Sequence, residues 1–160
     1  MDRANKIIKN SDYQKYLDEL QKIEKNRKFC RHNLSHFLDV ARIALIINLK
    51  TNAQINAEHI YAAALLHDIG RAKADVYEPS HAAVSAKLSE KILRDCCFFE
   101  SEINDILDAI INHGDENFNN VKNLSGILYM ADKLSRPCYM CDMKEPCFWS
   151  LDKKNLELKI

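Results

Sequence analysis

A nine-residue stretch near the middle of the chain, Ala62–Gly70, limits the fold more than any other feature of the sequence. It reads Ala-Ala-Ala-Leu-Leu-His-Asp-Ile-Gly, and its apolar run predicts a helix that is buried on nearly every side. The helix is predicted to end at His67 and Asp68, with Gly70 stopping it. An imidazole and a carboxylate at the edge of a core are costly unless they are paired or bound to a metal. We therefore expect both to be metal ligands, with other helices supplying further ligands.

The rest of the chain is predicted to be helical as well. Asn56 is a candidate N-cap for the helix that ends at His67, and Pro79 suits the first turn of the next helix. Apolar residues recur at helical spacing over residues 11–28, 32–49, 79–95, about thirteen residues from Ser101, and 123–135. The chain contains only 3 glycines and 3 prolines, which favours helices over a turn-rich β architecture. The expected fold is an all-α bundle of about six helices.

Length and charge limit the domain organisation and the partners. A chain of 160 residues suits one domain, which we divide into a helical part, 1–136, and a Cys-rich C-terminal extension, 137–160, packed on it. Lys+Arg and Asp+Glu both number 23, so no overall basic field favours nucleic acid, and we expect none as a partner. No signal peptide or long apolar run is visible, which predicts a cytoplasmic protein without membrane association. A homodimer is left open.

Candidate metal ligands recur on different predicted helices. His36, His81 and Asp132 fall on apolar faces, and His113 follows an apolar stripe at the end of its helix. Each alone is more simply explained as a satisfied core residue. Together with His67 and Asp68 they suggest a bundle that aims its polar residues at one interior point.

The order of these residues resembles the H…HD…D signature of the HD superfamily of metal-dependent phosphohydrolases. The resemblance covers roughly residues 30–136 and includes His36, Leu-Leu-His-Asp-Ile-Gly-Arg around His67, and Ala-Asp-Lys-Leu around Asp132. It implies an all-helical fold and a first metal held by His36, His67, Asp68 and Asp132. His81 and His113 match the extra ligands of dimetal members, so Asp68 would bridge to a second metal.

Differences between this sequence and two branches of the superfamily narrow the expected class of substrate. The chain lacks the Gly-Tyr-Pro motif of the cyclic-di-nucleotide branch, and Arg71-Ala72 stands where alarmone hydrolases have Glu-Asp. The dimetal branch that includes the bacterial dinucleoside tetraphosphate hydrolases is the nearest that the resemblance indicates. The expected substrate is a small phosphorylated molecule, a nucleotide by preference.

The resemblance predicts hydrolysis of a phosphate ester or anhydride by metal-bound hydroxide. Asp68 and Arg71 are the candidate catalytic residues. Arg71 is also the first candidate for a phosphate ligand, although it could equally be a solvated surface charge. Lys133 and Arg136 are weaker candidates, which a solvated surface charge explains more simply. Imidazole and carboxylate ligands suit one or two divalent transition metals, Fe or Mn first, with Zn, Co or Ni as alternatives. An HD-fold di-iron oxygenase and a non-catalytic metal-binding regulatory module remain as alternative functions.

Cysteines cluster near the C-terminus. Cys138 and Cys141 have the CxxC spacing of a metal chelate, Cys147 follows, and Cys30 could supply a fourth thiolate if the two regions pack together. Four thiolates could bind a structural Zn or, less readily, an iron–sulfur cluster. The alternative is that they are small buried apolar residues.

Overall fold

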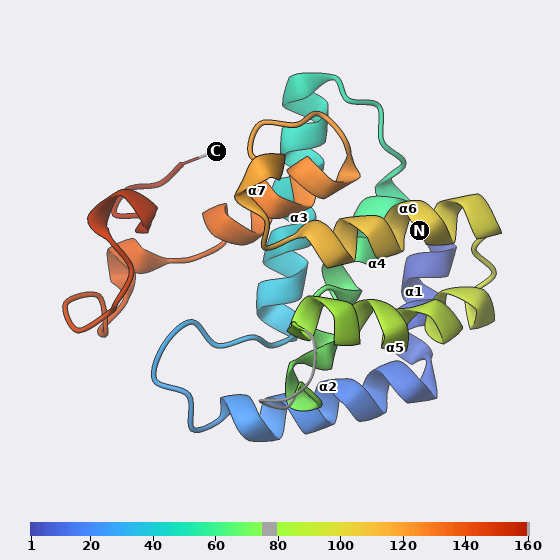
Figure 1. Cartoon of the computed structure of the whole chain (residues 1–160), viewed down its shortest axis with the longest axis horizontal. Helices are drawn as coiled ribbons and strands as arrows, with labels where there is room; N and C mark the ends of the chain where they lie inside the picture. The colour runs from blue at the N-terminus through green and yellow to red at the C-terminus, as the bar shows by residue number, and fades with distance from the viewer. Residues whose placement is uncertain (75–79, 160) are drawn as a thin grey trace.

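The computed structural model describes residues 1–74 and 80–159, and in these parts of the chain every regular element is a helix (Figure 1). Residues 75–79, which include the expected helix start at Pro79, lie outside the described residues. The elements are α1 (Asp2–Lys9), α2 (Ser11–Glu24), α3 (Leu34–Thr51), α4 (Ala57–Leu66), η1 (Ile69–Ala72), α5 (His81–Asp95), α6 (Glu100–Asn112), η2 (Glu116–Phe118), α7 (Leu124–Leu134), η3 (Cys138–Met140) and η4 (Leu151–Lys153). The predicted all-α fold is confirmed.

Helix α4 is the centre of the bundle. Its residues from Ala62 to Leu66 are fully buried, and the helix packs against α1, α3, α5, α6 and α7. Three successive alanines present little side-chain volume, so neighbouring helices can approach α4 closely. The sequence-based prediction of a helix buried on nearly every side is therefore correct.

Asparagine side chains begin several of these helices. Asn56 accepts a hydrogen bond from the backbone N–H of Glu58, as predicted, and Asn33 and Asn123 cap α3 and α7 in the same way. Helix α2 is capped by Asn10 rather than by its own first residue, Ser11. It ends at Glu24, four residues before the predicted limit of 28. This earlier end leaves a turn that leads the chain from α2 back to α3.

The chain passes Gly70 in a way that the sequence did not indicate. Helix α4 ends at Leu66, and Gly70 lies inside the short 3₁₀ turn η1 rather than at a helix stop. A Cβ atom on Gly70 would lie 2.4 Å from the backbone nitrogen of Ser85 and 2.8 Å from the carbonyl carbon of Val84. Only glycine therefore allows η1 to pack directly against α5, and Gly70 N–H donates to Ser85 Oγ at 2.9 Å.

The N-terminal segment forms a helix that was not among the six predicted. Ala4 and Ile7 of α1 are buried, and α1 packs against α2 and α4. Arg3 joins it to the bundle through ion pairs with Glu58 of α4 and Glu102 of α6. The segment was missed because eight residues give too few apolar positions to establish a period.

The C-terminal segment, red in Figure 1, projects from the side of the bundle beyond α7. Its described residues, 137–159, contain only the short turns η3 and η4, and none of their apolar side chains is buried. Among the described helices, none combines the length and apolarity needed to cross a lipid bilayer.

Candidate metal centre

His67 and Asp68 occupy the turn that follows the central helix. The backbone N–H of His67 donates to Ala63 O at 2.9 Å, which closes the last turn of α4. Asp68 then leaves helical geometry, with φ −119° and ψ 6°, and turns the chain into η1. Both residues are completely buried. The α4–η1 junction thus places two ionisable side chains inside the bundle, as predicted.

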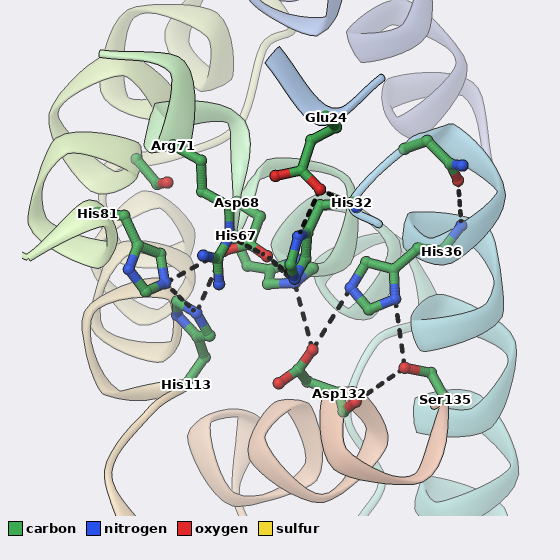
Figure 2. A network of polar contacts seen from close by, with 12 residues as sticks. Glu24, His32, His36, His67, Asp68, Arg71, His81, His113, Asp132 and Ser135 are labelled. Atoms are coloured by element: carbon green, nitrogen blue, oxygen red, sulfur yellow. Dashed lines mark hydrogen bonds and ion pairs between the residues drawn. The ribbon is translucent and has the colours of Figure 1, made fainter. Parts of the chain in front are cut away.

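The structure brings all six predicted metal ligands to this point. His36 comes from α3, His81 is the first residue of α5, His113 directly follows α6, and Asp132 comes from α7. Their side chains surround Asp68 and His67 in Figure 2. Five separate segments therefore converge on one small volume.

The ring orientations of His67 and His113 leave a nitrogen lone pair facing the centre of the site. Nδ1 of His67 lies 2.8 Å from Ala64 O, and Nδ1 of His113 lies 2.6 Å from Ile110 O. A carbonyl oxygen only accepts, so Nδ1 must be the protonated nitrogen in each ring. In a neutral ring Nε2 is then bare. Histidine ligands of metals are typically fixed in this way.

His36 is oriented by α7. Its Nδ1 lies 3.3 Å from Ser135 Oγ, which itself donates to the carbonyl oxygen of Asp132 at 2.8 Å. Ser135 therefore accepts from His36, whose Nε2 is left 3.4 Å from Asp132 Oδ1. This buried Nε2 has no hydrogen-bond partner among the described residues, and the same holds for Nε2 of His67.

The two carboxylate oxygens of Asp68 face different groups of histidines. Oδ1 lies 3.3 Å from His81 Nε2 and 3.5 Å from His113 Nε2, whereas Oδ2 lies 3.4 Å from His67 Nε2. Oδ2 also forms an ion pair with Arg71 Nε at 2.7 Å, and no contact of either oxygen with the described residues has the geometry of a hydrogen bond. A carboxylate placed in this way has one oxygen available to each of two neighbouring cation sites.

His32 also reaches the site, and the sequence analysis did not identify it. Its backbone N–H and its Nδ1 both contact Oε2 of Glu24, at 2.8 and 3.1 Å, while its Nε2 lies 3.5 Å from Asp68 Oδ2. Both His32 and Glu24 are buried. The signal in the sequence was weak: His32 stands four residues before His36 but in the turn that precedes α3, where helical periodicity does not apply.

Among the described residues there are three groups of side chains in which all the ligand atoms of the group lie within 4.8 Å of one another. The sets are His36, His67 and Asp132; Asp68, His81 and His113; and His32, His36 and Asp68. Bare imidazole nitrogens that face carboxylate oxygens repel each other unless a cation or proton lies between them. The orphaned buried atoms and the mixed nitrogen and oxygen donors therefore fit divalent transition metals.

The acidic side chains of the site are held ionised. Burial alone would raise the pKa of Asp68, but His67, His113, His81 and Arg71 lower it well below its usual range. Burial would likewise raise the pKa of Asp132, and contacts with His36 and His67 again lower it well below the ordinary value.

The protonation equilibrium of His32 is shifted toward the neutral form. Burial lowers its pKa, and this effect outweighs the opposing contact with Glu24. A neutral His32 that donates Nδ1–H to Glu24 presents a bare Nε2 to Asp68, and it then has the same tautomer as His67 and His113.

The three predicted phosphate ligands lie in different places. Arg71 is at the site, with Nε 2.7 Å from Asp68 Oδ2, and its side chain is 22% exposed. Lys133 pairs with Asp132 Oδ2 at 2.6 Å. Arg136 turns away: its guanidinium lies 4.4 Å from the centre of the Trp149 ring, so the structure does not bring it to the site. Arg71 and Lys133 remain the candidates.

The four cysteines of the predicted second metal site lie close together and outside the ligand sets of this centre. Cys30, Cys138, Cys141 and Cys147 all line one small cavity between the turn before α3 and the C-terminal segment. None of the six cysteines forms a disulfide.

The architecture and the site define a class: an all-helical domain with convergent histidines and aspartates suited to divalent metals. Residues 33–136 match the model of the HD domain, so the chain belongs to the HD domain family. HD domains bind divalent metals and are in general hydrolases, which agrees with the ligand clusters described above.

Two relatives extend the comparison. The chain is 43% identical over 158 residues to an uncharacterized protein of Clostridium beijerinckii, covering 99% of both chains. It is 28% identical over 117 residues to ribonuclease Y of Acetivibrio thermocellus, which covers 72% of this chain but only 20% of the ribonuclease. No solved structure matches the chain significantly. The comparisons thus show the HD domain, and they do not indicate the dinucleoside tetraphosphate hydrolase branch within it.

Proposed function

We propose that this chain is a metal-dependent phosphohydrolase that acts on a small phosphorylated substrate, by preference a nucleotide. One observation supports the proposal above the others: histidines and two carboxylates from different helices converge in one site, where Nε2 of His36 and Nε2 of His67 are buried without a hydrogen-bond partner among the described residues. The proposed ligands of a first metal are His36, His67, Asp68 and Asp132. Those of a second are Asp68, His81 and His113.

A bound divalent metal supplies two things in such a site, water acidic enough to act as a nucleophile near neutral pH and positive charge for the phosphoryl oxygens. The side chains of this protein provide the rest. Ser135, Ala64 O and Ile110 O fix the imidazole rings through Nδ1, so that each Nε2 is already oriented before the substrate arrives. Glu24 orients His32 in the same way.

The substrate is proposed to approach beside Arg71 and His81. The side chains of His81 and Arg71 are 31% and 22% exposed, whereas those of Asp68 and His67 are buried. A guanidinium at the mouth can contact two phosphate oxygens at once. Arg71 would then exchange its ion pair with Asp68 for the substrate phosphate.

The test is an assay of phosphate release on a panel of substrates under anaerobic conditions, with Mn²⁺ or Fe²⁺ added. The panel contains nucleoside mono-, di- and triphosphates, dinucleoside polyphosphates, cyclic nucleotides and a short single-stranded RNA. We expect turnover of a nucleotide, and loss of that turnover in Asp68→Asn. Activity confined to RNA would overturn the small-molecule substrate. Uptake of O₂ with an organic substrate, without any phosphate release, would overturn the hydrolase.

A further inference from the structure

A second cluster of ligating side chains lies outside the HD centre. The cavity between residues 29–30 and the C-terminal segment has a volume of about 20 Å³, and all four of Cys30, Cys138, Cys141 and Cys147 line it. This is room for one ion or one water molecule. We propose that these four cysteines bind a structural Zn²⁺ that attaches the C-terminal segment to the turn before α3.

The first argument comes from the absence of a core beneath the C-terminal segment. None of the apolar side chains of residues 137–159 is buried, and Met140, Phe148 and Leu151 are each more than 70% exposed. A stretch this short, without a core, ordinarily needs a disulfide or a metal to hold one conformation. Its cysteines form no disulfide, so their thiols are available to a metal.

The second argument comes from charge. Arg136, Lys144, Lys153 and Lys154 line the same cavity as the cysteines. The side chain of Lys154 is almost fully buried and donates to the carbonyl oxygen of Lys144 at 2.8 Å. Among the described residues, no carboxylate forms an ion pair with Lys154 or with Arg136. Buried cations need compensating charge, and four thiolates around one Zn²⁺ would leave two net negative charges to supply it.

The third argument comes from the backbone at Cys30. Its φ is +33°, in the left-handed region that a residue with a Cβ seldom occupies. The unusual turn places Cys30 at the wall of the cavity that the other three cysteines also line. Strained backbone of this kind is often kept where it positions a ligand.

Binding of the ion requires the sulfur atoms to move closer together. Within the described parts of the chain, the only groups of three ligand atoms within 4.8 Å of one another are those of the HD centre, and none of them contains a cysteine. The cysteines lie on turns and connecting segments rather than in the packed α-helices of the bundle. The edge-to-face contact of Phe29 with Phe148, 5.9 Å between ring centres, already holds the two segments together.

The experiment measures zinc in the full-length protein, purified without chelators under reducing conditions. We expect about one zinc per chain that is lost in the Cys138→Ser/Cys141→Ser double variant. The matched control is Cys97→Ser, because Cys97 is a free, exposed cysteine outside the cluster. His113→Ala separates the two sites, because it alters the HD centre and should retain this zinc. Zinc unchanged in the double variant would overturn the proposal.

Spectroscopy identifies the ligands independently of folding in the variants. Replacement of zinc by Co²⁺ in the wild-type protein should produce the intense near-ultraviolet band of thiolate-to-cobalt charge transfer. An organomercurial titration of the folded wild type should release zinc in step with the thiols. Labile sulfide with a visible iron chromophore, or a disulfide within the cluster detected by mass spectrometry, would contradict the zinc site.

Discussion

Nε2 of His32 lies 3.5 Å from Oδ2 of Asp68, and the opposite ring nitrogen of His32 contacts Glu24. The residue therefore links the last turn of α2 to the central carboxylate of the site. Its lowered pKa, caused by burial, keeps the ring neutral. A neutral histidine in this position either joins the metal ligands or orients what they bind.

We expect His32→Ala to lower metal affinity or kcat by about 10- to 100-fold, the usual effect of losing a residue that orients a metal site. Isothermal titration with Mn²⁺ and steady-state kinetics measure the two quantities. His59→Gln is the matched control, because His59 pairs with Glu102 away from the site. Equal behaviour of the two variants would show that His32 is only a core residue.

The number of bound metals distinguishes the two halves of the centre. His113→Ala removes a proposed ligand of the second metal only, so it should reduce the content of the HD centre from about two ions to about one. Asp68→Asn should reduce it further, because Asp68 faces both halves. Elemental analysis of the Cys138→Ser/Cys141→Ser background separates these ions from the proposed zinc. Metal content that is unchanged in His113→Ala would make His113 a core histidine.

Gly70→Ala should destabilise the protein by about 1–3 kcal/mol, the usual cost of overpacking. The added Cβ would meet the backbone of Ser85 and force η1 away from α5. Because η1 directly follows Asp68, metal affinity should fall as well. Gly114→Ala is the control, since a Cβ there meets nothing within 4 Å. Denaturant unfolding measures both variants, and equal stabilities would refute the close contact.

The N-terminal helix should make stability sensitive to acid. A hydrogen bond from Arg3 is the main cause that lowers the pKa of Glu58 and of Glu102 from 4.5 to about 2. A carboxyl whose folded-state pKa is depressed stabilises the protein above its ordinary pKa, and this contribution is lost as the pH falls from 4.5 toward 2.

Arg3→Gln should reduce this acid sensitivity by about 1 kcal/mol, a small amount because the pairs remain partly hydrated. Urea unfolding between neutral and acidic pH, with a chelator present, measures the difference. Parallel pH profiles for the wild type and the variant would contradict the assignment.

Arg71→Ala should reduce kcat/KM by about 10- to 100-fold, the loss expected for a hydrogen bond to a charged group. The reduction should appear mainly in KM if Arg71 binds the substrate phosphate in the ground state. Arg42→Ala is the control, because Arg42 pairs with Asp39 on an exposed face. A kcat/KM that remains at the wild-type value would assign Arg71 to the surface charges.

The helical fold could be predicted from the sequence because it depends on local patterns, and the set of six ligands because their order resembles the HD signature. Apolar periodicity places His36 and Asp132 on buried helix faces, and the apolar run places His67 and Asp68 at the end of the central helix. These signals lie within single helices, where 3.6 residues per turn fix the direction of each side chain.

The features that were missed depend on contacts between distant segments. His32 reaches Asp68 only because Glu24, eight residues earlier, fixes the turn before α3. The contact of Gly70 with α5 depends on how two elements cross, and the stacking of Arg136 on Trp149 depends on the path of the C-terminal segment. No helical or strand period encodes such relationships.

The two oxygens of Asp68 face two different groups of histidines, and this arrangement has a consequence for metal binding. Each oxygen faces one proposed half of the centre, so an ion in one half would hold the carboxylate in the geometry that the other half requires. Occupancy of either half should then raise the affinity of the other, and by the same factor in both directions. The protein would pass from empty to fully metal-bound over a narrow range of metal concentration. Its activity would then rise steeply above a threshold concentration of metal.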